Sequence, residues 1–395
     1  MGVQGLQQKT LGDLFDKKPS WSLFMNIGVP LESFPGETRV AVTPETVKKY
    51  LAQGHAVHVQ SGAGLNASIT DEAYRLAGAT MTDAQGAFSQ DMVLKVRIPN
   101  EQETSLMKEG SVLVGMLNPF DAAGLQRLAH AKLCSFALEA APRTTRAQSM
   151  DVLSSQANIA GYKAVMIAAD KYQRFFPMLM TAAGTVKAAR VVILGVGVAG
   201  LQAIATAKRL GAVIECSDVR PGVKEQVESL GAKFIDVPYE TQEEKDAAQG
   251  VGGYAKPMPA SWLERQKMEV AKRVALADIV ITTALIPGRA APVLVSQEMV
   301  MSMKAGSVVV DLAAAQGGNC PLTQADKTIQ VHGVTLVGET NLPALVAADA
   351  SALYARNVLD FVKLVSPKDG LFQWPEDDDI VAACLMTQDG TIKRK

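Results

Sequence analysis

The sequence predicts an α/β fold with two domains, each built on a mostly parallel β-sheet. Its 395 residues exceed the length of one typical domain. Apolar residues make up 48% and charged residues 20% of the chain, an ordinary composition with enough apolar material for buried cores. Short apolar runs alternate with helical stretches, a rhythm that places helices on both faces of a parallel sheet. We expect residues 1–24 to be an extension, 25–155 to form one domain and 156–344 the other.

The first domain is predicted from a regular series of strands and helices. After the strand-like "LFMNIGVP" comes the helical "TPETVKKYLAQG", in which Thr43 can cap the helix, Pro44 begins it and Gly54 ends it. "HAVHVQSG" alternates like a strand and "TDEAYRLAG" is helical in pattern. "MVLKVR", "SVLVGML" and "CSFALEA" are further strands, the last two separated by the helical "LQRLAHAK".

The second domain is predicted to begin with a long helix over "QANIAGYKAVMIAADKYQRFFPML", which could act as a rigid hinge. The strands "RVVIL" and "VIECSD" follow, with a glycine turn and a helix between them, and then "KFIDV", "DIVITTAL", "SVVVDLA" and "VTLVGE". A last helix, "AADASALYARNVLDFVKLV", is expected to cross back to the first domain. The tail "VAACLMTQDGTIKRK" predicts a closing hairpin.

Composition argues against several classes of protein. The net charge of −1 gives no basic surplus for nucleic acid or an anionic membrane. No apolar stretch is long enough to span a bilayer, and charged residues interrupt any secretory signal. The four cysteines are far apart, so we expect buried thiols, no disulfides, no metal site and a cytoplasmic location. These are Cys134, Cys216, Cys320 and Cys384.

The sequence G-x-G-x-x-G, formed by Gly195, Gly197 and Gly200, directly follows a strand and opens a helix. In this context the first glycine allows a tight turn, the second lets the backbone approach a pyrophosphate, and the third allows close helix–strand packing. Asp218 lies eighteen positions after Gly200, where a carboxylate can bind the adenosine ribose and repel a 2′-phosphate. The pattern therefore predicts a Rossmann-type domain for NAD rather than NADP. The alternative is that Asp218 only pairs with Arg220 at the surface.

Ligands of such sheets lie beyond the carboxyl ends of the strands, so two loops should line the site, 282–288 and 311–319. In the first loop Thr282, Ala284 and Leu285 are expected walls, although a merely packed loop would look the same. The long loop over 237–259 is interpreted as a lid carrying Gly253, Tyr254 and Ala255, with disorder as the alternative. The residues expected to contact the dinucleotide at the glycine turn and after the next strand are Gly195, Val196, Gly197, Val198, Ala199, Gly200, Asp218, Val219 and Arg220.

Several segments resemble the NAD(H)-binding component, domain I, of the proton-translocating nicotinamide nucleotide transhydrogenases. They include "PRTTRAQSMDVLSSQANIAGY", "DVRPGVKEQVESLGAKF", "ITTALIPGRAAPVL" and "MKAGSVVVDLAAAQGGNCPL". The resemblance runs from about Met25 to the C-terminus. It implies two Rossmann-like domains with parallel sheets, linked by long hinge helices, the first completed by residues 345–395. It also implies a nicotinamide-contacting loop and a mobile loop with Tyr254. The four polar residues matching the first loop are Arg143, Gln148, Asp151 and Ser154.

The resemblance further implies NAD(H) on this chain, NADP(H) on a partner subunit and a separate membrane-spanning subunit for proton translocation. A homodimer, peripheral at the cytoplasmic face of the inner membrane, is expected. Hydride transfer from NADH to NADP⁺ needs no general acid or base, so catalysis depends on proximity, alignment and exclusion of water. Polar side chains such as Gln148, which both donates and accepts hydrogen bonds, suit that task. Asp151 could instead simply cap the helix that follows it.

Two other functions compete with this interpretation. The motifs "ETRVAVTP" and "LKVRIPNEQE" also resemble alanine dehydrogenase, in which the residues matching Arg39 and Lys95 hold the substrate. That family uses a histidine after the next strand, whereas this chain has Asn118, which cannot exchange a proton near neutral pH. Arg39 and Lys95 are then expected to form structural ion pairs. A regulatory NAD-sensing module would keep the glycines and Asp218 but would not need the polar loop.

Overall fold

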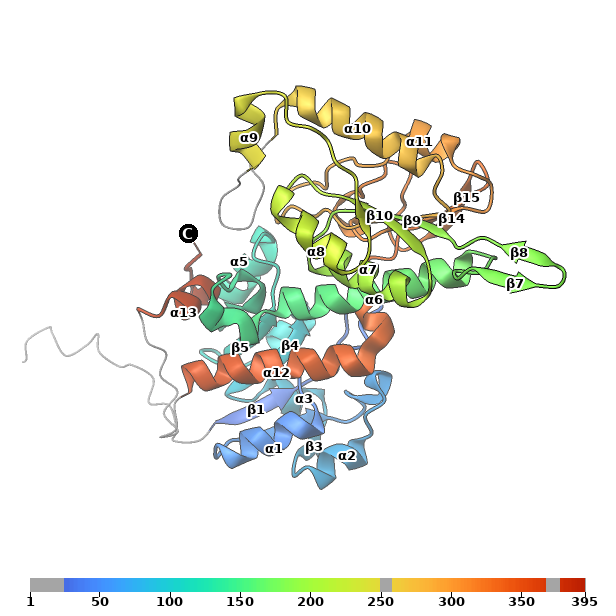
Figure 1. The fold of residues 1–395 in the computed structure, drawn as a ribbon. Helices are drawn as coiled ribbons and strands as arrows, with labels where there is room; N and C mark the ends of the chain where they lie inside the picture. Colours follow the sequence, from blue (N-terminus) through green and yellow to red (C-terminus); the bar gives the residue numbers. More distant parts are fainter. Residues whose placement is uncertain (1–24, 249–257, 367–376, 395) are drawn as a thin grey trace, which may run out of the picture.

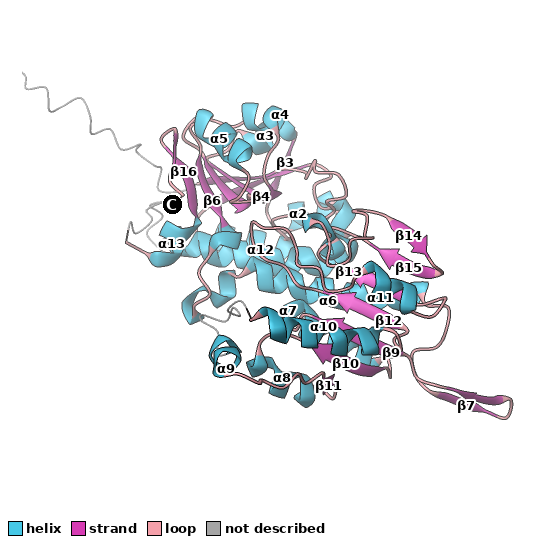
Figure 2. Ribbon diagram, turned by 90° about the horizontal axis from the view of Figure 1, so that it is seen from above, coloured by secondary structure: helices cyan, strands magenta, loops and turns pink. Residues whose placement is uncertain are grey.

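A computed structural model describes residues 25–248, 258–366 and 377–394 and shows two open α/β sheets (Figure 1). The predicted fold class is confirmed. Within the described residues the first sheet has eight strands in the order β17-β16-β6-β5-β4-β1-β2-β3, and the second has seven in the order β11-β10-β9-β12-β13-β15-β14. Helices α6 (Val152–Lys171) and α12 (Ala347–Val365) lie side by side between the two sheets (Figures 1 and 2).

The first sheet is parallel except at its C-terminal hairpin. Its strands are β1 (Asn26–Val29), β2 (Ala56–Gln60), β3 (Thr80–Thr82), β4 (Met92–Arg97), β5 (Val112–Met116), β6 (Cys134–Ala137), β16 (Leu385–Gln388) and β17 (Thr391–Ile392). Its helices are α1 (Pro44–Ala52), α2 (Asp71–Leu76), α3 (Ala84–Phe88), α4 (Glu101–Ser105), α5 (Ala122–His130) and α13 (Asp379–Cys384). As predicted, α1 begins at Pro44, and Gly54 lies past its end with φ +90°.

The second sheet is parallel except for its edge strand β14. Its strands are β9 (Arg190–Leu194), β10 (Val213–Ser217), β11 (Lys233–Phe234), β12 (Ile279–Thr282), β13 (Val308–Asp311), β14 (Thr328–Val331) and β15 (Val334–Val337). Its helices are α7 (Val198–Arg209), α8 (Lys224–Ser229), α9 (Gln242–Ala248), α10 (Ala260–Val274) and α11 (Gln297–Ser302). Short 3₁₀ turns occur in both domains at Leu65–Ala67, Leu138–Ala140, Thr145–Met150, Pro221–Val223, Ala314–Gln316 and Leu342–Val346.

Both faces of the second sheet are buried, as is usual for parallel strands. Along β9 the side chains alternate, because Val191 and Ile193 belong to one apolar core while Val192 and Leu194 belong to the other. The first core lies against α6 and α7, and the second lies against α10 and α11. This packing fixes the carboxyl end of β9, where the glycine turn begins.

Two sequence expectations differ from the structure. The predicted long helix ends at Lys171, because Pro177 cannot continue it, and a hairpin of β7 (Leu179–Thr181) and β8 (Gly184–Val186) follows instead. The C-terminal tail does form the expected hairpin, β16–β17, but its first residues belong to α13. This hairpin extends the first sheet, since β16 pairs with β6.

Candidate functional site

The glycine turn joins β9 to α7, and each glycine has a different steric reason to be there. Gly195 has φ +93°, a conformation that side chains disfavour. A Cβ on Gly200 would lie 2.1 Å from the carbonyl oxygen of Gly195, so α7 could not pack so closely on the turn. A Cβ on Gly197 would meet nothing within 4 Å. The space in front of Gly197 is therefore open to a ligand, while the other two glycines are required by the fold.

The open space lies at the N-terminus of α7, which begins at Val198 directly after Gly197. Gly197 has no side chain to cap the first amides of the helix, which include those of Ala199 and Gly200. Free amides and the helix dipole together favour an anion here. The turn is thus shaped to accept a pyrophosphate. Helix α6 contributes Gly161, whose Cβ would lie 2.1 Å from the carbonyl oxygen of Ala199, a close contact that the sequence analysis missed.

Asp218 lies directly beside the turn, after β10. Its Oδ2 accepts a hydrogen bond of 2.7 Å from the backbone amide of Val196, and its side chain is only 6% exposed. Arg220 donates to the same carboxylate from its backbone amide, its Nε and its Nη2, at 2.9, 2.9 and 3.0 Å. Both interpretations of Asp218 therefore hold together: the acid adjoins the turn, and it is ion-paired. Val219 lies between the two residues.

The loop after β12 contacts the turn through a residue that the sequence analysis did not single out. Thr283 donates a hydrogen bond of 2.8 Å to the carbonyl oxygen of Gly195. The expected wall residue Thr282 is buried and donates to Asp311 at 3.0 Å. Asn319 holds Ala284 by its backbone amide and carbonyl at 3.1 and 2.9 Å. Leu285 is 48% exposed.

The polar loop before α6 lies on the first domain. Arg143 and Gln148 are exposed, while Asp151 caps α6 by accepting hydrogen bonds from the amide and hydroxyl of Ser154 at 2.9 and 2.5 Å. The capping role considered for Asp151 is therefore present in this structure. Asn357 of α12 anchors the loop by donating to the carbonyl oxygen of Ser149 at 2.7 Å.

A second anchor of the polar loop is Arg146, which pairs with Asp378 at 2.5 Å and also with Asp379. Hydrogen bonding to Arg146 holds the pKa of Asp378 below its usual value. Neither anchor was found from the sequence, because both join residues more than 200 positions apart. The other expected ligand residues, Gly253, Tyr254 and Ala255, lie outside the described residues, as does the extension 1–24.

Arg39 and Lys95 form ion pairs inside the first domain, as expected if they have structural roles. Arg39 binds Glu37 at 2.6 Å, and Lys95 binds Glu103 at 3.0 Å and Glu32 at 3.4 Å. Burial opposes ionisation of Glu37, but hydrogen bonds from Arg39 outweigh it and bring the pKa of Glu37 to about 2. Burial raises the pKa of Glu32 despite its contact with Lys95. These side chains are already paired with one another.

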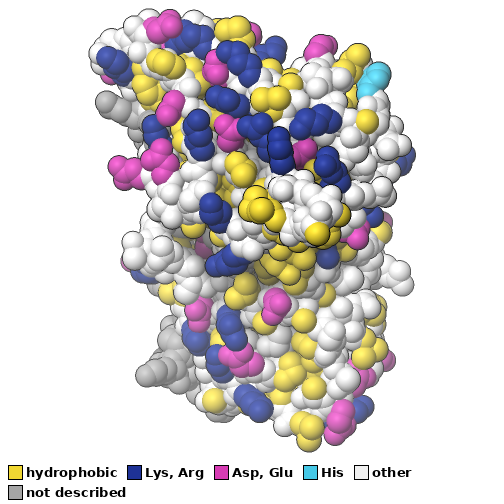
Figure 3. Space-filling model, turned by 45° about the vertical axis from the view of Figure 1, so that its right-hand side comes forward, with side chains coloured by type: hydrophobic (Ala, Val, Ile, Leu, Met, Phe, Trp, Pro, Cys, Tyr) yellow, Lys and Arg dark blue, Asp and Glu magenta, His cyan; other side chains and the backbone are white. Residues whose placement is uncertain are grey.

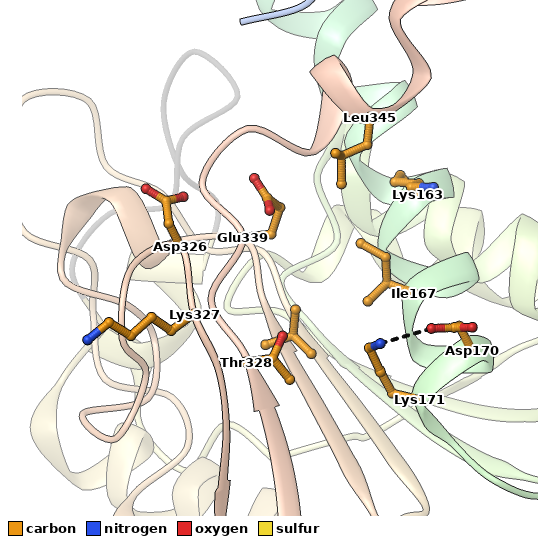
Figure 4. Close-up of a pocket in the computed structure, with 10 residues that line it drawn as sticks. Lys163, Ile167, Asp170, Lys171, Asp326, Lys327, Thr328, Glu339 and Leu345 are labelled. Carbon is orange, nitrogen blue, oxygen red and sulfur yellow. Dashed lines mark ion pairs between the residues drawn. The ribbon is translucent and has the colours of Figure 1, made fainter. Parts of the chain in front are cut away.

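A separate cavity of about 230 Å³ lies where α6 meets β14, β15 and the segment before α12 (Figure 4). Its charged side chains are of both signs, and Lys171 pairs with Asp170 at 3.0 Å. Asp326 accepts hydrogen bonds from the amide and hydroxyl of Thr340. None of the described residues predicted to contact the dinucleotide lines this cavity.

Two features are absent from the residues that the structure describes. No group of three or more histidine, cysteine or acidic residues there is arranged to hold a metal ion. Among the helices in the described ranges, none combines the length and apolarity needed to cross a membrane.

The fold and the open glycine turn define a two-domain α/β protein of the dinucleotide-binding class. Comparison with known proteins makes this specific. The family model "Alanine dehydrogenase/PNT, N-terminal domain" matches residues 28–160, and "Alanine dehydrogenase/PNT, C-terminal domain" matches residues 164–395. The chain belongs to the alanine dehydrogenase/PNT family.

Both transhydrogenases and alanine dehydrogenases are similar to the chain. An NAD(P) transhydrogenase subunit alpha chain of Rhodospirillum rubrum is 50% identical over 378 residues, covering 93% of this chain and 97% of that protein. The crystal structure of transhydrogenase from Sinorhizobium meliloti has a TM-score of 0.85 and 46% identity, covering 93% of this chain and 99% of that one. An L-alanine dehydrogenase structure has a TM-score of 0.77 and 28% identity, with 94% and 97% covered.

Proposed function

We propose that this chain is the NAD(H)-binding subunit of a proton-translocating nicotinamide nucleotide transhydrogenase. It would transfer hydride directly from NADH to NADP⁺ held by a partner subunit, as a Re/Si-specific transhydrogenase. A membrane-spanning subunit would couple the reaction to proton translocation and keep this chain peripheral at the cytoplasmic face of the inner membrane. The observation that carries the proposal is the open space at Gly197 beside Asp218, in a chain 50% identical to a transhydrogenase subunit.

The described residues divide the work of binding between the two domains. The turn from Gly195 to Gly200 and the first amides of α7 would hold the pyrophosphate. The loop 282–285 and the described neighbours of Asp218 would line the adenosine side. Arg143, Gln148, Asp151 and Ser154 would align the nicotinamide ring, and Gly253, Tyr254 and Ala255 would cover it.

The choice of NAD over NADP depends on the balance between Asp218 and Arg220. An arginine at this edge of a site can accommodate a 2′-phosphate, which would favour NADP. Here the Arg220 side chain donates twice to Asp218, so much of its charge is already compensated. Asp218 can exchange one of these hydrogen bonds for the ribose hydroxyls of NAD. A 2′-phosphate would instead face the carboxylate.

Hydride transfer requires little acid–base chemistry from this chain. The C4–H bond of NADH breaks with its electron pair, which forms the new C4–H bond of NADPH, and no proton is taken up or released. The described polar residues therefore need only hold the donor ring and exclude water. Asp151 is suited to a positioning role, since it is fixed by Ser154 at the start of α6.

We include a homodimer in the proposal because of the β7–β8 hairpin, which projects from the body of the molecule (Figure 1). Phe175, Met178 and Met180, which lie just before the hairpin or in its first strand, are 55, 60 and 70% exposed. Hydrophobic side chains gather near mid-height on the face that Figure 3 brings forward. Exposed apolar patches of this kind usually mark contact surfaces. Met178→Glu with Met180→Lys should therefore yield monomers in light scattering, whereas unchanged dimers would exclude the hairpin.

The decisive experiment mixes the purified chain and an NADH analogue of distinct absorbance with a separately purified NADP(H)-binding transhydrogenase domain. Rapid hydride transfer to NADP⁺ that requires both proteins is the expected result. Tight NADH binding with no transfer would contradict the proposal and favour a regulatory NAD-binding module. Alanine and pyruvate serve as control substrates, because their turnover would instead indicate a dehydrogenase.

A further inference from the structure

The two domains touch at an exposed aromatic residue that the proposed function does not use. Phe120 lies between β5 and α5 of the first domain and is 55% exposed. Gly288 belongs to the loop after β12 in the second domain and has φ +70°. A Cβ on Gly288 would lie 2.4 Å from Cδ1 and 2.5 Å from Cε1 of Phe120. The ring therefore rests directly on the Gly288 backbone, across the boundary between the domains.

A third residue holds the ring from the first domain. The guanidinium carbon of Arg394, just after β17, lies 4.2 Å from the centroid of the Phe120 ring. This distance is typical of a cation–π contact. Phe120, Gly288 and Arg394 together are called the Phe120 contact below.

The backbone beneath the ring is also fixed. Asn118 has φ +51°, and its amide donates to Oε1 of Glu139 at 2.7 Å. The amide of Asp121 donates to the carbonyl oxygen of Asn118 at 2.9 Å, which closes a tight turn around Phe120. The ring thus projects from a rigid support rather than from a freely moving loop.

The Phe120 contact is separate from the buried connection between the domains. Asn341, which lies between β15 and α12, donates to Glu37 at 3.1 Å and accepts from Arg39 at 3.4 Å. Arg39 also donates to Gln156 of α6 at 2.8 Å. Segments such as these, at the ends of elements, usually absorb hinge rotation between domains. A second contact away from the hinge is what fixes the degree of opening.

The loop that carries Gly288 also contacts the glycine turn. Its first residue, Thr283, donates to Gly195, and the next, Ala284, is held by Asn319. A displacement of Phe120 would therefore change both the distance between the domains and the loop beside the turn. We propose that Phe120 is a positioning residue, which acts through Gly288 to hold the two walls of the cleft at the separation that one dinucleotide spans. This inference rests on the proposed function, since the dinucleotide is taken to bind both domains.

A double-mutant cycle across the domain boundary tests the inference, using Phe120→Ala, Gly288→Ala and the double variant in the full chain. Loss of a partly exposed cation–π contact should weaken NADH binding about two- to fivefold. Gly288→Ala should also weaken binding, because its methyl group displaces the ring. In the Phe120→Ala background that displacement has no target, so the two effects should not add. Phe120→Tyr keeps the ring and should bind NADH as the unchanged protein does.

A second measurement reports the domain separation without any nucleotide. Leu76→Cys on α2 and Met268→Cys on α10 place labels on exposed positions of the two domains, at 79 and 56% exposure. The four native cysteines are buried and should not react. Phe120→Ala should broaden the distribution of distances between two spin labels. Phe34→Ala is the matched control, because Phe34 is 53% exposed and lies over Arg97, which belongs to its own domain.

The outcomes separate the inference from the proposed function. An unchanged distance distribution with additive binding effects would overturn the role of Phe120, even if NADH binds tightly. If the unmutated chain binds no NADH, the proposed function fails, and with it the link from Phe120 to the dinucleotide. The distance measurement would then still show whether Phe120 holds the domains together.

Discussion

The carboxylate of Asp218 accepts a hydrogen bond of 2.7 Å from the backbone amide of Val196, inside the glycine turn. The two residues lie at the ends of neighbouring parallel strands, β10 and β9. A carboxylate that binds the turn is well placed to reach a ligand held by the same turn. The arrangement also means that Asp218 supports the conformation of the turn before any ligand binds, so its removal should affect both.

Asp218→Asn should weaken NADH binding and reduce discrimination against NADPH. The amide oxygen can still accept from Val196, but the charge is lost and the amide nitrogen faces the guanidinium of Arg220. Hydrogen bonds to charged groups contribute about 1.5–3 kcal/mol, so a loss of about tenfold or more in NADH affinity is expected. Calorimetric titrations with NADH and NADPH measure both quantities.

The control for this prediction is Asp236→Asn, which removes an exposed carboxylate paired with Lys224 in the same domain. It should leave the affinity for both nucleotides unchanged. A preference for NADH that survives in Asp218→Asn would show that the carboxylate does not select the nucleotide.

Gly197→Ala and Gly200→Ala should have opposite consequences for folding and binding. A Cβ at position 197 meets nothing within 4 Å, so the melting temperature should hardly change, while a pyrophosphate would meet the methyl group. A Cβ at position 200 lies 2.1 Å from the carbonyl oxygen of Gly195, and such overpacking costs about 1–3 kcal/mol of stability. Thermal unfolding and NADH titration of both variants check this. Unchanged NADH affinity in Gly197→Ala would remove the pyrophosphate from the turn.

Local patterns in the sequence were enough to predict the parts of the fold that local physics controls. Pro44 begins a helix because its fixed φ and missing amide suit that position, and the glycine turn follows its strand as the spacing predicted. The predicted end of α6 was wrong because Pro177 was included in a helical pattern. Thr282 was expected to be a wall of the site, but strand alternation directs it to Asp311, and Thr283 contacts the turn instead.

The supports of the candidate site could not be predicted, because they join distant segments of the chain. Asn357 holds Ser149 across 208 positions, and neither residue stands out in its own segment. Gly161 is one small residue in a helix, and only the approach of Ala199 shows why a side chain is excluded there. Resemblance to a family identified the residues of the polar loop, but the anchors of that loop become visible only in the folded chain.

Glu139 should make the stability of the protein fall as pH rises from 4.5 to 7. Burial raises its pKa from 4.5 to about 7, and its Oε2 has no hydrogen-bond partner among the described residues. In this window the unfolded chain ionises while the folded protein stays protonated, so the stability present below pH 4.5 is lost by about pH 7. The full shift corresponds to at most about 3 kcal/mol.

Glu139→Gln imitates the protonated side chain and should not show this loss. The difference in unfolding free energy between the variant and the unchanged protein should therefore move in favour of the variant between about pH 5 and about pH 8. Denaturant unfolding at both values measures it. Glu109→Gln, an exposed glutamate paired with Lys132, is the control and should give the same difference at both pH values. A constant difference for Glu139→Gln would mean that Glu139 titrates normally.

Gln148→Asn should slow hydride transfer far more than it weakens NADH binding. Gln148 is exposed at the end of the polar loop, whose backbone is held by Asn357, so the shorter side chain loses reach while the loop keeps its place. Alignment of two reacting rings is sensitive to such displacements, and a misplacement of about 1 Å can cost about 100-fold in rate. Single-turnover transfer to NADP⁺ on the partner domain gives the rate, and NADH titration gives the affinity. Ser149→Ala, beside it in the loop, keeps the backbone carbonyl that Asn357 binds and should change neither. Equal losses of rate and affinity in Gln148→Asn would mean that this residue binds NADH without aligning it.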